Sequence, residues 1–190
     1  DECVSTPCKN GAVCASSGIG SVGSKKVSAN AYRCTCKAGY ANGVCGYAFI
    51  KQYDALCKVT ESSVSQTHGG NCDVDINECQ SSPCKNGGIC AESSTNASIK
   101  VDSYSCTCPT PGYANGICSY SYIAEYSTQC SVAEGGNCDL DVNECASKPC
   151  KNGAICTDST AETMVAVNTY QCTCAAGYAN GVCEYAFIKQ

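Results

Sequence analysis

The sequence predicts a small disulfide-rich fold, built from three similar β-hairpin modules joined by β-rich connectors that carry cysteines of their own. One spacing of six cysteines occurs three times, and the 190-residue chain contains 22 cysteines but no Trp, only two Phe and a net charge of −5. So many cysteines in a chain poor in large apolar residues indicate an oxidising compartment. Small modules of this kind bury too little surface to fold on apolar burial alone. Disulfides are therefore expected to hold the fold, each bridge that closes about 15 residues contributing roughly 3 kcal/mol.

The cysteine spacing is the same in each copy. Four residues separate the first two cysteines, five separate the next two, a variable stretch leads to a Cys-x-Cys, and eight or nine residues precede the last cysteine. The three sets are Cys3, Cys8, Cys14, Cys34, Cys36 and Cys45; Cys79, Cys84, Cys90, Cys106, Cys108 and Cys118; and Cys145, Cys150, Cys156, Cys172, Cys174 and Cys183. The variable stretches are rich in Ser, Thr, Gly and Asn, which predicts hairpin tips.

The repeats set the expected domain boundaries. We expect modules over 1–45, 75–118 and 141–183, connectors over 46–74 and 119–140, and the start of a third connector over 184–190. Alternating aromatics open each connector (Tyr47 and Phe49; Tyr120 and Tyr122), which predicts a short strand there. The string YAFIKQ at 185–190 repeats 47–52 letter for letter, so we expect the full protein to continue with further repeats.

Charge and hydropathy narrow the possible partners. The mildly acidic chain has no basic patch, which argues against nucleic acid and anionic membrane surfaces. No apolar run approaches the roughly 20 residues of a membrane-spanning helix, so no membrane span is expected in this segment. An extracellular location, secreted or at the cell surface, is expected.

The spacing, together with an aromatic two residues before the fourth cysteine (Tyr32, Tyr104, Tyr170) and a Gly-Tyr pair in the last loop, resembles the EGF-like module. The resemblance implies pairing of the first cysteine with the third, the second with the fourth and the fifth with the sixth. It therefore implies Cys3–Cys14, Cys8–Cys34 and Cys36–Cys45; Cys79–Cys90, Cys84–Cys106 and Cys108–Cys118; and Cys145–Cys156, Cys150–Cys172 and Cys174–Cys183.

Four further cysteines leave two arrangements open. Either Cys57–Cys72 and Cys130–Cys138 form separate connector bridges, or the connectors are insertions in the last loop, with Cys45–Cys57 nested inside Cys36–Cys72. The length of the loop between Cys36 and Cys45 and the closure of all cysteines within the chain favour separate bridges. The equal spacing of Cys45 to Cys57 and of Cys118 to Cys130 favours nesting. We expect separate bridges.

The strings DINEC and DVNEC before the second and third modules resemble the amino-terminal half of the calcium site of calcium-binding EGF modules. Carboxylate and carbonyl oxygens are the ligands that calcium takes. A further ligand is expected two residues after the third cysteine, where Asp158 fits, Glu92 stands in the second module and Ser16 in the first. The candidate ligands are Asp75, Ile76, Glu78, Asp141, Val142, Glu144 and Asp158. The alternative is that these acids cap turns and hydrogen-bond the backbone.

Sugar attachment is expected at two kinds of motif. The string C-x-S-x-P-C resembles the O-glucosylation site of EGF modules and occurs at Ser5, Ser81 and Ser147. The single N-x-S/T sequon is at Asn96, in a predicted loop tip.

No enzyme activity is expected. The only histidine, His68, lies in a Gly/Ser/Thr-rich connector without a repeated partner, and a chain of hairpins offers no catalytic cleft. Near-identical tandem units instead favour an extracellular structural protein: a segment of a fibre, a matrix or a cell-surface appendage filament, comparable to flagellar hairs or microfibrils, that associates with copies of itself. The alternative is the ectodomain of a receptor, ligand or adhesion protein that binds a protein partner through calcium-stabilised modules.

Overall fold

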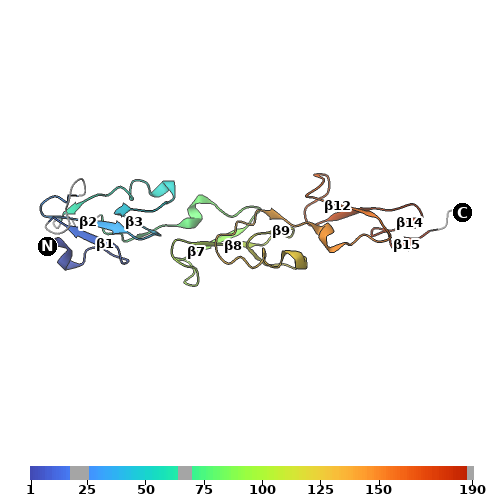
Figure 1. Cartoon of the computed structure of the whole chain (residues 1–190), viewed down its shortest axis with the longest axis horizontal. Coiled ribbons are helices and arrows are strands. Elements are labelled where there is room, and N and C mark those ends of the chain that lie inside the picture. Colours follow the sequence, from blue (N-terminus) through green and yellow to red (C-terminus); the bar gives the residue numbers. More distant parts are fainter. Residues whose placement is uncertain (18–25, 64–69, 188–190) are drawn as a thin grey trace. The chain divides into compact units, whose positions relative to one another are not determined.

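The computed structural model describes residues 1–17, 26–63 and 70–187 of the chain (Figure 1). These residues form short strands and single 3₁₀ turns, and no α-helix occurs among them. The elements are η1 (Glu2–Ser5), β1 (Val13–Ser16), β2 (Ala31–Cys36), β3 (Tyr40–Ala41), β4 (Val44–Cys45), η3 (Lys51–Tyr53), β5 (Ser62–Ser63), β6 (Val74–Asp75), η4 (Glu78–Ser81), β7 (Ile89–Glu92), β8 (Tyr104–Cys108), β9 (Tyr113–Ala114), β10 (Ile117–Cys118), η5 (Ala124–Tyr126), β11 (Leu140–Asp141), η6 (Glu144–Ser147), β12 (Ile155–Asp158), β13 (Tyr170–Thr173), β14 (Tyr178–Ala179) and β15 (Tyr185–Ala186).

The chain divides into two compact units. The first contains 1–81 and 92–103, and the second contains 82–91 and 104–190. In the first unit β1 and β2 form the antiparallel hairpin, with Cys14 opposite Cys34, and β4 runs parallel to β2. In the second unit β12 and β13 repeat the hairpin, with Cys156 opposite Cys172, and β10 runs parallel to β8. The predicted β-hairpin modules are thus confirmed.

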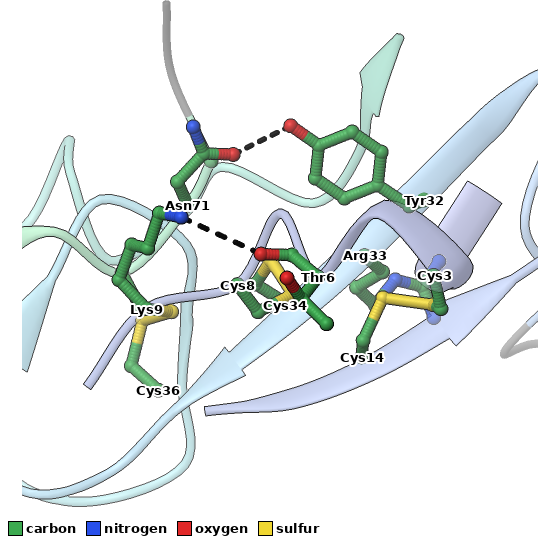
Figure 2. Close-up of a disulfide and its surroundings, with 12 residues drawn as sticks. Cys3, Thr6, Cys8, Lys9, Cys14, Tyr32, Arg33, Cys34, Cys36 and Asn71 are labelled. Carbon is green, nitrogen blue, oxygen red and sulfur yellow. Dashed lines mark hydrogen bonds between the residues drawn. A yellow bond between two sulfur atoms is a disulfide. The ribbon is translucent and has the colours of Figure 1, made fainter. Parts of the chain in front are cut away.

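Sulfur and small side chains form most of the interior. One buried cluster at the first hairpin consists of Tyr32 and three cysteines, Cys34, Cys36 and Cys72. Figure 2 shows the Tyr32 hydroxyl pointing at the side chain of Asn71, whose Oδ1 accepts its hydrogen bond, beside the Cys8–Cys34 disulfide. A core of this size cannot replace the cross-links, as the composition predicted.

All 22 cysteines, each in the described part of the chain, are disulfide-bonded. The first-to-third and second-to-fourth pairings are confirmed where the structure gives the bridge: Cys3–Cys14, Cys8–Cys34, Cys84–Cys106, Cys145–Cys156 and Cys150–Cys172. In the third module Cys174–Cys183 is confirmed as well.

The pairing expected for the connectors is wrong. The structure contains Cys36–Cys72 with Cys45–Cys57 nested inside it, and Cys108–Cys138 with Cys118–Cys130 nested inside it. It therefore excludes Cys36–Cys45, Cys57–Cys72, Cys108–Cys118 and Cys130–Cys138.

Backbone pairing explains the nested bridges. In the first connector the Leu56 carbonyl accepts hydrogen bonds from the N–H groups of Asn42 (3.0 Å) and Gly43 (2.9 Å), and this pairing brings Cys57 to within 4.9 Å of Cys45 between Cα atoms. Cys72 then donates its N–H to the Asn42 carbonyl at 2.6 Å, next to Cys36. The second connector repeats these contacts with Gln129 in the place of Leu56.

In every module one asparagine side chain donates a hydrogen bond to the backbone carbonyl of the cysteine that ends the last disulfide of the module. The side chains of Asn10, Asn86 and Asn152, from the repeated KNG strings, donate to the carbonyls of Cys72, Cys138 and Cys183, each at 2.9 Å. All three cysteines adopt a positive φ, between 54° and 60°. Cys183 therefore occupies the place that Cys72 and Cys138 occupy, although its sequence context GVC matches that of Cys45.

We expected short strands at Tyr47–Phe49 and at Tyr120–Tyr122. Both segments are described by the structure, and neither forms a strand. The Tyr47 hydroxyl donates instead to the Tyr40 carbonyl, and the Tyr47 and Phe49 rings pack edge to face with centroids 6.4 Å apart. Tyr47–Phe49 does not pair with β3 because the edge of β3 is already paired with β6.

Candidate metal centre at the acidic segments

An acidic segment pairs with the Gly-Tyr strand of the preceding repeat. In the first unit β6 lies antiparallel to β3, with Asp75 opposite Tyr40, and the Ile76 N–H donates to the Gly39 carbonyl at 2.8 Å. In the second unit β11 pairs with β9 in the same register, and the Val142 N–H donates to the Gly112 carbonyl at 2.7 Å. The pairing fixes the backbone of both acidic segments.

Apolar packing anchors the same segments. Ile76 is 2% exposed and packs with Ala41 and Cys57, while Val142 is 3% exposed and packs with Ala114 and Cys130. The nested disulfides thus supply part of the surface on which the acidic segments sit. Fully burying one such side chain contributes about 1.5–3 kcal/mol.

In the second module this packing gathers carboxylates. Both carboxylate oxygens of Glu78 and Oδ1 of Asp75 are buried and make no hydrogen bond within the described residues. Burial, and then repulsion from Glu92, Asp75 and Asp102, raises the pKa of Glu78 to about 7. Burial and the charge of Glu92 also raise the pKa of Asp75. Buried carboxylates without partners are costly, so a cation at this site would stabilise them.

The third module repeats the arrangement. Both carboxylate oxygens of Glu144 and Oδ1 of Asp141 are buried without a hydrogen bond in the described part of the chain, whereas Asp141 Oδ2 accepts from the Ser159 hydroxyl at 3.0 Å. Burial first, and then the charges of Asp141 and Asp158, raises the pKa of Glu144.

The first module differs. Glu2, which matches Glu78 and Glu144 in position, accepts hydrogen bonds from the Ser17 N–H at 3.3 Å and the Ser17 hydroxyl at 3.2 Å. Backbone hydrogen bonding lowers the pKa of Glu2. Asp1 accepts from the Cys3 N–H at 3.0 Å. The acids of this module therefore cap turns, as the alternative interpretation of the motif requires.

The ligand expected two residues after the third cysteine is buried, but its carboxylate already accepts hydrogen bonds from the protein. Asp158 is 1% exposed and accepts from the Thr160 N–H at 3.2 Å and the Thr160 hydroxyl at 2.7 Å. Glu92, also 1% exposed, accepts from the Ser94 N–H at 3.3 Å. Both side chains accept hydrogen bonds from the turns that follow them. Their negative charges also help to raise the pKa of the neighbouring Glu78 and Glu144.

The described residues contain no ready-made cluster of three or more His, Cys, Asp or Glu around one point. Calcium does not require one, because it also accepts backbone carbonyls and water. The chemistry of the donors fits calcium in both modules: the buried oxygens without a hydrogen bond are Oδ1 of Asp75 and both carboxylate oxygens of Glu78, and likewise Oδ1 of Asp141 and both carboxylate oxygens of Glu144.

Sequence reasoning missed three contributors to these sites. Tyr53 and Tyr126 accept hydrogen bonds from the Asn77 and Asn143 N–H groups, each at 2.9 Å, and so fix the acidic segments from the connectors. Their equal spacing from Cys57 and Cys130 was the available signal. The third is Asp102, whose negative charge contributes to raising the pKa of Glu78; it has a positive φ of 65° and lies two residues before the aromatic Tyr104.

The serines of the glucosylation-like strings are Ser5, Ser81 and Ser147. Each is exposed and is the last residue of a 3₁₀ turn, η1, η4 or η6. Each hydroxyl donates to a carbonyl three residues earlier, at 3.2, 3.1 and 3.0 Å. Asn96 is also exposed and accepts from the Ser98 N–H at 3.0 Å. His68 lies outside the described residues.

Comparison with known proteins agrees with this architecture. A family model described as EGF-like domain matches residues 3–42 and 145–180. The chain is 28% identical over 83% of its length to the mouse (Mus musculus) "EGF-like repeat and discoidin I-like domain-containing protein 3", of which it covers 24%. It is 36% identical over 45% of its length to "Delta-like protein 4" of Rattus norvegicus and 27% identical over 60% to "Protein glp-1" of Caenorhabditis elegans, covering 9% of each.

The chain thus spans a quarter or less of the length of these relatives. No helix in the described ranges is both long enough and apolar enough to cross a bilayer. The disulfide frame and the hairpin register agree with the two matched regions: residues 3–42 and 145–180 are EGF-like domains, the module between them has the same cysteine spacing, and the location is extracellular, secreted or at the cell surface.

Proposed function

We propose that this chain is a segment of an extracellular structural protein, a fibre, matrix or cell-surface appendage filament, whose repeats are stiffened by calcium at the acidic segments. One observation carries the proposal: the same acidic segment is seated on the same Gly-Tyr strand, in the same register, in both units. Uniform joints between near-identical repeats suit a polymer that extends in one dimension.

Calcium supplies the positive charge that these sites lack. Asp75 and Glu78 would hold it in the second module together with the Ile76 carbonyl, and Asp141, Glu144 and the Val142 carbonyl would do so in the third. Asp158 and Glu92 would contribute mainly through their negative charge, because their oxygens already cap turns. Bound calcium would cross-link each acidic segment to its module and so limit bending.

Thermal unfolding with calcium and with chelator tests this metal site. Glu78→Gln and Glu144→Gln should each reduce the calcium-induced rise in Tm. Glu2→Gln is the matched control, because Glu2 precedes the first cysteine in the same way but is already hydrogen-bonded to Ser17. An unchanged Tm on adding calcium to the unmodified chain would remove the metal from the proposal.

A second candidate function is that of a ligand or receptor ectodomain that binds a protein partner. The similarity to "Delta-like protein 4" and "Protein glp-1" favours it. Electron microscopy of native material separates the two candidates. Filaments of defined width support the structural role, whereas dispersed particles that capture a partner protein support the ectodomain.

Glycans at Ser5, Ser81, Ser147 and Asn96 belong to the same proposal. Their exposure leaves room for attachment. Intact-mass measurement of the native protein, before and after glycosidase treatment, would count the sugars and show whether all three serines carry them.

A further inference from the structure

Each connector forms one wall of a small pocket next to an acidic segment. In the first unit the pocket has a volume of about 200 Å³ and is lined by Ala48, Phe49, Ile50, Ile76, Glu78 and Asp102. In the second unit the volume is about 250 Å³, and the matching residues are Ser121, Tyr122, Ile123, Val142, Glu144 and Asn168. The same pocket is therefore built twice, once in each unit.

Hydrogen bonds fix the two sides of each pocket relative to each other. In the first unit the Tyr53 hydroxyl of the connector accepts from the N–H of Asn77, the residue directly before Glu78, at 2.9 Å. In the second unit Tyr126 and Asn143 make the same contact at 2.9 Å. Both pockets are thus present in the chain before any ligand binds.

A buried carboxylate without a hydrogen bond lies in the wall of each pocket. Glu78 and Glu144 are each 8% exposed, and none of their carboxylate oxygens makes a hydrogen bond within the described residues. Asp102 adds a second carboxylate to the first pocket, at an exposed position, where the second pocket has the neutral amide of Asn168. The residues that line the two pockets include no Lys or Arg, so neither wall neutralises this negative charge.

The rest of the lining is largely apolar and does not suit a metal ion. Phe49 and Ile50 are half-buried, and Ile76 is 2% exposed. Calcium binds through oxygen ligands and would use none of these side chains. Each cavity also has room for several water molecules. A ligand that fits both parts of the lining has an aliphatic stem that covers the apolar wall and a cationic group that pairs with the carboxylate.

We propose that each pocket binds a basic side chain of a partner polypeptide, with its stem against the connector and its ammonium or guanidinium group at Glu78 or Glu144. The stems of lysine and arginine pack on apolar surfaces while their charged ends stay near water. Their hydrogen bonds to a carboxylate are charge-assisted and stronger than those between neutral groups. This site does not depend on calcium binding, although calcium at the same carboxylate competes with it.

Titration of the ¹⁵N-labelled, disulfide-intact chain with N-acetyl-lysine N-methylamide, and separately with its arginine analogue, tests the site in the presence of chelator. A pH of 8 keeps Glu78 ionised, since its pKa is about 7. Saturable shifts of the Ile50 and Glu78 amides report on the first pocket, and those of Ile123 and Glu144 report on the second. For so small a probe we expect dissociation constants on the order of 1 mM.

The matched control probe is the norleucine analogue, which has the stem of lysine without its charge. It should bind at least about tenfold more weakly than the lysine probe. Among variants of the chain, Asp102→Asn gives the first pocket the amide of the second and should weaken binding there about two- to fivefold, while Asn168→Asp should strengthen binding in the second pocket by a similar factor.

Glu78→Gln should weaken binding in the first pocket at least about tenfold and leave the second unchanged, which also shows that the variant is folded. The proposal is overturned if neither basic probe gives saturable shifts, if the norleucine probe binds as well, or if Glu78→Gln keeps its affinity in the first pocket. A chain that binds the probes in chelator but shows no rise in Tm with calcium retains this site and loses the metal. The reverse result retains the metal and overturns this site.

Discussion

The hydroxyl oxygen of Tyr53 accepts a 2.9 Å hydrogen bond from the backbone N–H of Asn77, and the second connector repeats the contact between Tyr126 and Asn143 at 2.9 Å. Each tyrosine closes the 3₁₀ turn η3 or η5 of its connector, while each asparagine follows the buried Ile76 or Val142. The connectors therefore position the acidic segments and are not passive spacers.

Tyr53→Phe should weaken the proposed calcium site in the second module. The variant keeps the ring but leaves the Asn77 N–H without its acceptor, at a cost of about 1 kcal/mol. Calcium affinity measured by calorimetry should fall about three- to tenfold. Tyr122→Phe is the control, because Tyr122 lies on the other connector and is 46% exposed. Equal effects of the two variants would contradict a positioning role for Tyr53.

The sequence was sufficient to predict the modules because cysteine spacing and hairpin register are local properties. The bridges Cys3–Cys14 and Cys8–Cys34 followed from the family resemblance and are present. The connector bridges could not be predicted, because they depend on how Leu56 pairs with Asn42 across an intervening turn. For the same reason Tyr53 was missed: its role depends on a contact with a residue 24 positions away.

Thiol counting provides a direct test of the nested disulfides. The double variant Cys45→Ser/Cys57→Ser removes one complete bridge and should contain no free thiol. The double variant Cys36→Ser/Cys45→Ser breaks two bridges and should expose two thiols, on Cys72 and Cys57. Separate connector bridges would give the reverse counts. Loop-closure entropy predicts a loss of about 3 kcal/mol of stability for the Cys45–Cys57 bridge and about 4 kcal/mol for Cys36–Cys72.

The stability of the folded chain should depend on pH through the protonation of Glu78. Its pKa is raised from 4.5 to about 7 in the folded chain, mainly by burial, so the folded state holds a proton that the unfolded state releases. In chelator, stability should be greatest below about pH 4.5 and should decrease as the pH rises through about 7.

Thermal unfolding between pH 4 and 8 measures this effect. Glu78→Gln should flatten the decrease, and calcium should do so as well, because the cation replaces the proton as the partner of the carboxylate. Glu2→Gln should leave the decrease intact, since the pKa of Glu2 is lowered and its contribution has the opposite sign. An undiminished decrease in Glu78→Gln would show that another group is responsible.

Alanine at the three Gly-Tyr glycines should separate backbone strain from packing. Gly39, Gly112 and Gly177 all adopt a positive φ, at 87°, 93° and 94°, so the conformational cost of Ala, about 1–2 kcal/mol, is common to the three. A new Cβ would lie 2.8 Å from the Asp102 nitrogen at position 39 and 2.8 Å from the Asn168 nitrogen at position 112. Overpacking against backbone should add a further loss of about 1–3 kcal/mol at these two sites.

Gly177→Ala is the matched control, because its Cβ would meet open space. Hydrogen exchange of the Ile76 and Val142 amides should accelerate in Gly39→Ala and Gly112→Ala respectively, since their acceptors are the carbonyls of the substituted residues. The Phe187 amide should change less in Gly177→Ala, because no loop is displaced there. Equal destabilisation at all three positions would mean that backbone strain alone determines the cost, and that loop cover contributes nothing to seating the acidic segments.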